Sequence, residues 1–172
     1  MFVFILPFLV GPAAGGFGSG PKILVADYQT NWTGLLTFLT TDQVIWLKYS
    51  NKSVGNIECL GWKKTALTGN SYTFVKSYHE GWLKKSFTQK AELINVTEKP
   101  AIKMLSGPYA GERYIMDYWN FNEKCALFFG PGSLCQQYVW NSHVKTSRVC
   151  NAAYAETCRG TRYEIYKINC AP

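Results

Sequence analysis

The sequence has few of the residues and motifs that most enzymes and metal proteins need. It contains only two histidines, His79 and His143, and it has no phosphate-binding glycine loop, no Gly-x-Ser-x-Gly and no His-Glu-x-x-His motif. We therefore expect no catalytic residues, no metal site and no cofactor. The one enzymatic alternative is a secreted ribonuclease-like catalyst that would use the two histidines as acid and base.

Long apolar segments are also missing. The apolar run over residues 2–10 is too short to span a bilayer, so we expect no membrane insertion. Small residues follow it, including Ala13 and Ala14, which predicts a cleaved signal peptide over residues 1–16 and a single domain over 17–172. The alternative is an apolar N-terminal strand of the fold. The net charge is +7, but no block of five or more basic residues indicates a nucleic-acid partner.

Cysteines are concentrated in the last third of the chain. Five of the six lie within residues 124–170, whereas Cys59 lies far upstream, and no pair has the spacing of a zinc knuckle. An even number at wide, irregular spacing is typical of disulfides that form in an oxidising compartment. With three glycosylation sequons, at Asn31, Asn51 and Asn95, this predicts a secreted, extracellular glycoprotein, which we expect to be a monomer.

Hydrophobic periodicity predicts one helix followed by about eight strands. Residues 30–40 have apolar side chains at helical spacing, with Thr30 or Asn31 as the N-cap. The expected strands, rich in β-branched and aromatic residues and separated by turn signals, are 44–49, 56–66, 71–78, 82–96, 101–105, 113–119, 124–129 and 136–140. A second helix is expected over 147–157, ended by Gly160, with extended chain over 162–169. This order favours an all-β sandwich or up-and-down barrel with flanking helices.

Several short segments, taken together, resemble one family. They are IECLG at 57–61, residues 99–104, KCALF at 124–128, YVW at 138–140, RVC at 148–150 and TRYEI at 161–165 before Cys170. In their order and cysteine placement they resemble the tick salivary lipocalins typified by the histamine-binding proteins, over residues 31–170. The resemblance implies an eight-stranded antiparallel lipocalin barrel that encloses one small ligand. It also implies disulfides Cys59–Cys170 and Cys125–Cys150, which leaves Cys135 and Cys158 for a third.

The same resemblance implies what the protein does. Members of the family are saliva proteins that bind small host mediators and keep them from host receptors; their ligands include histamine, serotonin, leukotrienes, fatty acids and cholesterol. The expected function is therefore non-enzymatic sequestration of a small inflammatory mediator, in the service of evasion of host defence. An immunomodulator that binds a host protein through its outer loops is the alternative.

The residues leave a biogenic amine and a lipid nearly level as the ligand. A buried cationic amine needs carboxylates and gains from aromatic faces. By resemblance, Glu98 falls where one amine-binding carboxylate of the family lies. Tyr138 and Ala126, however, stand where acidic residues of the family would be.

A single carboxylate among aromatic residues could still hold an amine. Asp117 could do so if it points inward, and by strand alternation it shares a face with Trp119, opposite Tyr114 and Tyr118. Basic residues near a barrel mouth would instead suit a lipid carboxylate, and the candidates are Lys48, Lys76, Lys103 and Arg113. The expected ligand-binding residues are Trp46, Glu98, Tyr114, Asp117, Tyr118, Tyr138 and Trp140.

Overall fold

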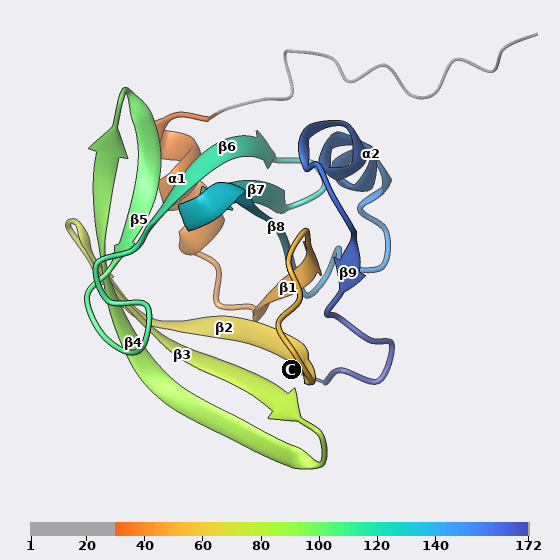
Figure 1. Cartoon of the computed structure of the whole chain (residues 1–172). Helices are drawn as coiled ribbons and strands as arrows, with labels where there is room; N and C mark the ends of the chain where they lie inside the picture. The colour runs from red at the N-terminus through yellow and green to blue at the C-terminus, as the bar shows by residue number, and fades with distance from the viewer. Residues whose placement is uncertain (1–29, 172) are drawn as a thin grey trace, which may run out of the picture.

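A computed structural model describes residues 30–171 as a closed barrel flanked by two helices (Figure 1). The expected signal peptide over 1–16 lies outside the described residues. Helix α1, Trp32–Leu39, begins after Asn31, whose side-chain oxygen accepts a hydrogen bond of 2.8 Å from the N–H of Gly34. Asparagine favours this position because its side chain satisfies a free N–H of the first turn. The helix expected over 30–40 is confirmed.

Eight antiparallel strands form the barrel. They are β1 (Ile45–Ser50), β2 (Ile57–Thr68), β3 (Ser71–Glu80), β4 (Leu83–Val96), β5 (Lys99–Met104), β6 (Arg113–Asn120), β7 (Cys125–Gly130) and β8 (Leu134–Trp140). Each strand from β2 to β7 pairs with the next, and β1 pairs with both β2 and β8, which closes the barrel. A 3₁₀ turn, Pro131–Ser133, joins β7 to β8. The predicted eight-stranded antiparallel barrel with two helices is confirmed.

The closure between β1 and β2 is short and depends on a glycine. Only two residue pairs form it, Ile45 with Trp62 and Trp46 with Gly61. A Cβ atom at Gly61 would lie 2.7 Å from Cε3 of Trp46 and 2.8 Å from Cγ1 of Val44. Since real Cβ atoms do not approach other atoms so closely, any larger residue at this position must displace the side chains of Trp46 and Val44 or the strand that carries them.

The inner face of the barrel is packed mainly with apolar and aromatic side chains. Helix α1 covers part of it, because Leu35, Phe38 and Leu39 are all fully buried in the inner cluster. The ring of Phe38 packs 5.2 Å from Trp119 and 5.7 Å from Phe128, measured between ring centroids. The first helix therefore completes the core of the barrel from one side.

A second cluster lies on the outer face. Helix α2, Arg148–Thr157, packs with the C-terminal segment against the outward side chains of β1, β7 and β8, and all six cysteines belong to this cluster. Three disulfides join Cys59 to Cys170, Cys125 to Cys150 and Cys135 to Cys158. These are the pairings that the resemblance to the tick salivary lipocalins implies. The disulfides thus fasten the helix and the tail to the outside of the barrel.

The ends of α2 differ from the sequence-based expectation. The carboxylate of Glu123 accepts hydrogen bonds from the N–H groups of Val149 (3.0 Å) and Cys150 (2.7 Å), so a side chain from the β6–β7 turn caps the helix. At the other end the C-cap is Cys158, in an extended conformation, and the glycine cap predicted at Gly160 is wrong. The Cys158 disulfide to β8 accounts for this, since it draws the chain out of the helix at that residue.

Two further strand expectations need correction. The pairing of β6 with β7 shifts register between Met116 and Tyr118, so Asp117 sits in an irregularity that breaks the alternation of faces. Trp119 consequently belongs to the inner cluster, with Tyr114 and Met116, and not to the face of Asp117. Beyond α2, only the short strand β9, Tyr163–Glu164, adds to β1, so most of the extended segment expected over 162–169 is unpaired with the sheet.

Replacing Gly61 by alanine should destabilise the fold by about 1–3 kcal/mol, because the new methyl group overlaps Trp46 and Val44. Chemical denaturation measures the change in the free energy of unfolding. Lys63→Ala, at an exposed position of the same strand, is the control and should change stability by no more than about 0.5 kcal/mol. Equal stability of the two variants would contradict the importance of the close approach.

Removing the Cys59–Cys170 disulfide should cost more stability than removing Cys135–Cys158. The two bonds span 111 and 23 residues, and the chain-entropy relation gives about 5 and about 3 kcal/mol for loops of these lengths. Both double alanine variants lose the same atoms. The difference between their free energies of unfolding, measured with denaturant, therefore isolates the effect of loop length. A larger cost for the shorter loop would refute this account.

Candidate functional site

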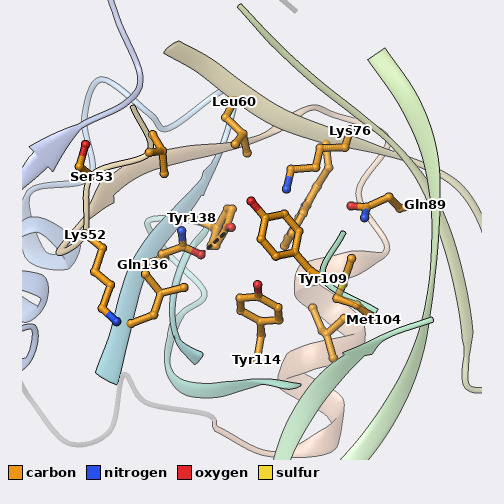
Figure 2. Close-up of a pocket in the computed structure, with 14 residues that line it drawn as sticks. Lys52, Ser53, Leu60, Lys76, Gln89, Met104, Tyr109, Tyr114, Gln136 and Tyr138 are labelled. Atoms are coloured by element: carbon orange, nitrogen blue, oxygen red, sulfur yellow. Dashed lines mark hydrogen bonds between the residues drawn. The ribbon is translucent and has the colours of Figure 1, made fainter. Parts of the chain in front are cut away.

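The barrel holds a cavity of about 220 Å³. Its wall comes from strands β2 to β6 and β8 and from the loops over 51–56 and 105–112, and no residue of α1 lines it. Figure 2 shows the lining side chains converging on this space from several strands. A concave site built from alternate, inward-pointing residues of a barrel is the usual place for a small ligand.

Apolar and aromatic side chains make up much of the wall. Leu60, Ile102 and Met104 contribute aliphatic surface. The indole of Trp62 stacks on the ring of Tyr138, with a centroid distance of 4.5 Å and an interplanar angle of 9°. These rigid surfaces suit a flat or hydrocarbon-rich ligand, since burial of apolar area supplies most of its binding free energy.

One cation, Lys76, points into this apolar space. On β3 it follows Tyr72 and Phe74 at alternate positions, so the strand directs all three side chains inward. The ammonium lies 4.8 Å from the ring centroid of Tyr109, and Figure 2 shows it directed into the cavity. Among the described residues it forms no ion pair within 4.0 Å. Burial lowers the pKa of Lys76 to about 8, partly opposed by the charge of Glu112.

Within the described residues, no aspartate or glutamate lines the cavity. Glu112 lies outside the wall, and its carboxylate accepts a hydrogen bond of 2.7 Å from the hydroxyl of Tyr114, which lines the cavity. Burial and this hydrogen bond raise the pKa of Tyr114, and burial raises that of Tyr138. Both phenols therefore stay neutral at physiological pH. The hydroxyl of Tyr138 donates to Oε1 of Gln136 at 3.0 Å.

The wall also contains two buried polar atoms without a hydrogen-bond partner among the described residues, Nε1 of Trp62 and Oε1 of Gln89. Gln89 is held at its other end, where Nε2 donates to the carbonyl of Ser106 at 3.2 Å. A Cβ at Gly107 would lie 2.7 Å from that Nε2, so glycine lets the 105–112 loop come close to β4. The wall therefore has one donor and one acceptor that a polar ligand could satisfy.

Two of the seven expected ligand residues, Tyr114 and Tyr138, line the cavity. Trp140 belongs to the inner packing but lies beside α1, where its Nε1 donates to the carbonyl of Phe38 at 3.0 Å. Trp46 and Tyr118 pack in the outer cluster, with the ring of Trp46 5.6 Å from that of Tyr166.

The two expected carboxylates also lie away from the cavity. Glu98 is exposed in the two-residue turn between β4 and β5, with a φ of 68°. Asp117 forms an ion pair with Lys99. Neither residue is therefore in a position to meet a molecule inside the barrel.

Of the four basic candidates, only Lys76 lines the cavity. Lys48 lies under α2 and donates to Oγ of Ser147 at 3.0 Å, Lys103 lies 3.9 Å from Glu92, and Arg113 is exposed. Sequence reasoning missed the lining residues Trp62, Gln89 and Tyr109. Alternation along β3 from the apolar Tyr72 and Phe74 is the signal that places Lys76 inside.

The histidines of the enzymatic alternative do not line the cavity. His79 is a half-buried residue of β3, and His143 lies in the turn after β8, where its Nδ1 is 2.7 Å from Oγ of Ser142. Among residues 30–171, no group of three or more His, Cys, Asp or Glu side chains could hold a metal ion. No helix in that range is long and apolar enough to cross a membrane.

Comparison with known proteins adds structural neighbours only. No model of a protein family and no curated protein sequence matches the chain. Among solved structures, Japanin from Rhipicephalus appendiculatus, bound to cholesterol, is 12% identical with a TM-score of 0.57 over 74% of this chain and 94% of its own. A serotonin complex of AM182 is 15% identical with a TM-score of 0.57 over 76% of this chain and 86% of its own. The chain therefore has the barrel fold of these proteins, and its resemblance to the tick salivary lipocalins is confirmed at the level of the fold.

Proposed function

We propose that the protein binds and sequesters a small, mainly apolar molecule that carries a carboxylate, such as a fatty acid or a leukotriene. The observation that supports this most directly is the inward ammonium of Lys76, set among aromatic and aliphatic side chains without a carboxylate in the cavity wall. An unpaired charge in such surroundings is costly. A ligand carboxylate would remove that cost, while its hydrocarbon part would cover Leu60, Ile102 and Met104.

A cationic amine is the second candidate. Its support is the carboxylate of Glu112, which is linked to the cavity through Tyr114, and the serotonin bound by AM182. Against it stands the charge of the site, because an amine would meet the like charge of Lys76 and no carboxylate directly in the wall. The cholesterol bound by Japanin agrees with an apolar ligand in this fold. The balance of charges therefore favours the lipid carboxylate.

The proposed setting is extracellular, in evasion of host defence, with the chain secreted and acting without catalysis. Three disulfides agree with an oxidising compartment. Asn31 and Asn95 are exposed and are the sequons we propose for glycans. The amide of Asn51 is engaged instead, because its Nδ2 donates to the carbonyls of Ser133 (2.9 Å) and Arg159 (3.1 Å). Binding of a host protein through the outer loops remains the alternative function.

Replacing Lys76 by methionine should have two opposite effects. Affinity for decanoate should fall by about ten- to a hundredfold, the worth of a charge-assisted hydrogen bond of about 1.5–3 kcal/mol. The ligand-free variant should unfold at a higher temperature than the wild type, since it no longer buries an unpaired ammonium. Calorimetric titration with decanoate and arachidonate, and thermal unfolding without ligand, measure the two effects.

Lys52→Met is the matched control, because Lys52 is exposed at the cavity mouth and its Nζ donates to the carbonyl of Gly132. Lys52→Met should change the affinity for decanoate and the unfolding temperature less than Lys76→Met does. Histamine and serotonin are titrated beside the fatty acids. Submicromolar amine binding that is lost in Glu112→Gln, with no fatty-acid binding, would overturn the lipid proposal in favour of the amine. Failure of every small ligand would favour the host-protein alternative.

Binding of decanoate should weaken at alkaline pH. Lys76 carries its charge below a pKa of about 8 in the empty protein and loses it above that value, while the ligand is ionised above about pH 6. A bound carboxylate raises the lysine pKa, so affinity should stay constant from about pH 6 to 8 and fall at higher pH. The affinity of Lys76→Met should not change over this range. Tighter binding by the wild type at high pH would contradict the role of the ammonium.

A further inference from the structure

We propose that Lys76 captures aliphatic aldehydes in the cavity as reversible imines, so that the protein retains lipid aldehydes covalently as well as lipid carboxylates non-covalently. This inference rests on the proposed function, because both ligands would place the same hydrocarbon chain in the same cavity. It adds a chemical step that simple sequestration does not require.

The position of Lys76 sets it apart from the other lysines of residues 30–171. Only Lys76 and Lys52 line the cavity, and Lys52 is exposed with its Nζ bonded to the carbonyl of Gly132. The Nζ of Lys76 makes no hydrogen bond or ion pair among the described residues; its neighbour is the face of Tyr109, 4.8 Å away. When neutral, this nitrogen therefore has a free lone pair, and Figure 2 shows the nitrogen directed into the space that a ligand would fill.

The surroundings of Lys76 favour the neutral amine that attacks a carbonyl. A lysine in an apolar pocket is the usual form of an imine-forming lysine, since burial penalises the ammonium. With a pKa of about 8 in place of 10.5, the neutral fraction at neutral pH is on the order of a hundredfold larger than for an exposed lysine. Surface lysines such as Lys63 and Lys84 have no comparable pocket.

The reaction balances without an oxidant or a reductant. The lone pair of Nζ forms a C–N bond to the aldehyde carbon, and the π electrons of the C=O bond move to oxygen. The nitrogen, now cationic, gives up one proton and the oxygen takes one up, which leaves a neutral carbinolamine. The resulting carbinolamine loses its hydroxyl group as water while nitrogen loses its proton, which gives the C=N bond. Tyr109, whose ring packs on Lys76, carries a hydroxyl that can donate the proton to the departing oxygen.

The cavity wall selects the class of aldehyde. Leu60, Ile102 and Met104 offer aliphatic surface to an alkyl chain, whereas a hydroxyl-rich sugar aldehyde would lose its hydration there without gaining partners. The substrate class that fits is therefore a long-chain alkyl aldehyde.

Trapping with decanal tests this inference. The intact protein is incubated at neutral pH with decanal and cyanoborohydride, which reduces an imine to a stable secondary amine, and labelled lysines are identified by peptide mass spectrometry. We expect Lys76 to be labelled at least about tenfold faster than Lys63 and Lys84, as its larger neutral fraction requires. Excess decanoate should suppress labelling at Lys76 and leave the two exposed lysines unchanged.

Lys76→Arg is the variant that separates the imine from the charge, since arginine keeps the positive charge and forms no such imine. It should retain decanoate binding within about tenfold and lose the labelling at this position. Lys63→Arg, at an exposed position of β2 outside the cavity, should retain both the binding of decanoate and the labelling of Lys76. Decanoate protection in the wild type gives the same information if the arginine variant does not fold.

The outcomes distinguish the inference from the proposed function. Decanoate binding with equal labelling of all three lysines, or with no labelling of Lys76, overturns the imine and leaves carboxylate binding intact. If the protein neither binds decanoate nor shows selective labelling of Lys76, both proposals are overturned. Selective labelling of Lys76 without decanoate binding supports the imine and overturns the carboxylate proposal.

Discussion

The structure depends on the two-sided pairing of β1. Because β1 bonds to both β2 and β8, the sheet has no free edge between them, and every strand acquires one inner and one outer face. The pairing with β2 involves only two residue pairs and requires the missing side chain of Gly61. This contact helps to close one seam of the barrel, and the closed barrel defines both the cavity inside and the outer surface on which α2 packs.

Lys76 is a charged residue on the inner face of the barrel, where stability alone would favour an apolar side chain. Its neighbours Tyr72 and Phe74 on the same inner face are fully buried, and a third apolar residue would continue the packing. The ammonium is tolerated because Tyr109 offers its ring face and because the barrel does not rely on the inner cluster alone. The disulfides and the packing of α2 on the outer face supply stability that does not involve the cavity.

The course of the chain was largely predictable, because inward and outward residues alternate along strands and the turns contain glycine and proline. The residues of the cavity were less predictable. One register shift in β6 was enough to reverse the predicted relation of Asp117 to Trp119, and alternation cannot foresee where such a shift occurs. Glu98 was placed by resemblance at a position that the fold makes an exposed turn. The cap of α2 by Glu123 joins segments far apart in the chain, which no local pattern reveals.

The separation of the six cysteines from the cavity has a consequence for how such a protein can change over generations. All six belong to the outer cluster, and none of them lines the cavity. A substitution among the lining residues therefore leaves the covalent framework untouched, and a change in the framework leaves the lining untouched. Selection can act on the two sets almost independently. In a barrel of this kind, a few inward substitutions can change the ligand without altering the disulfide pairing.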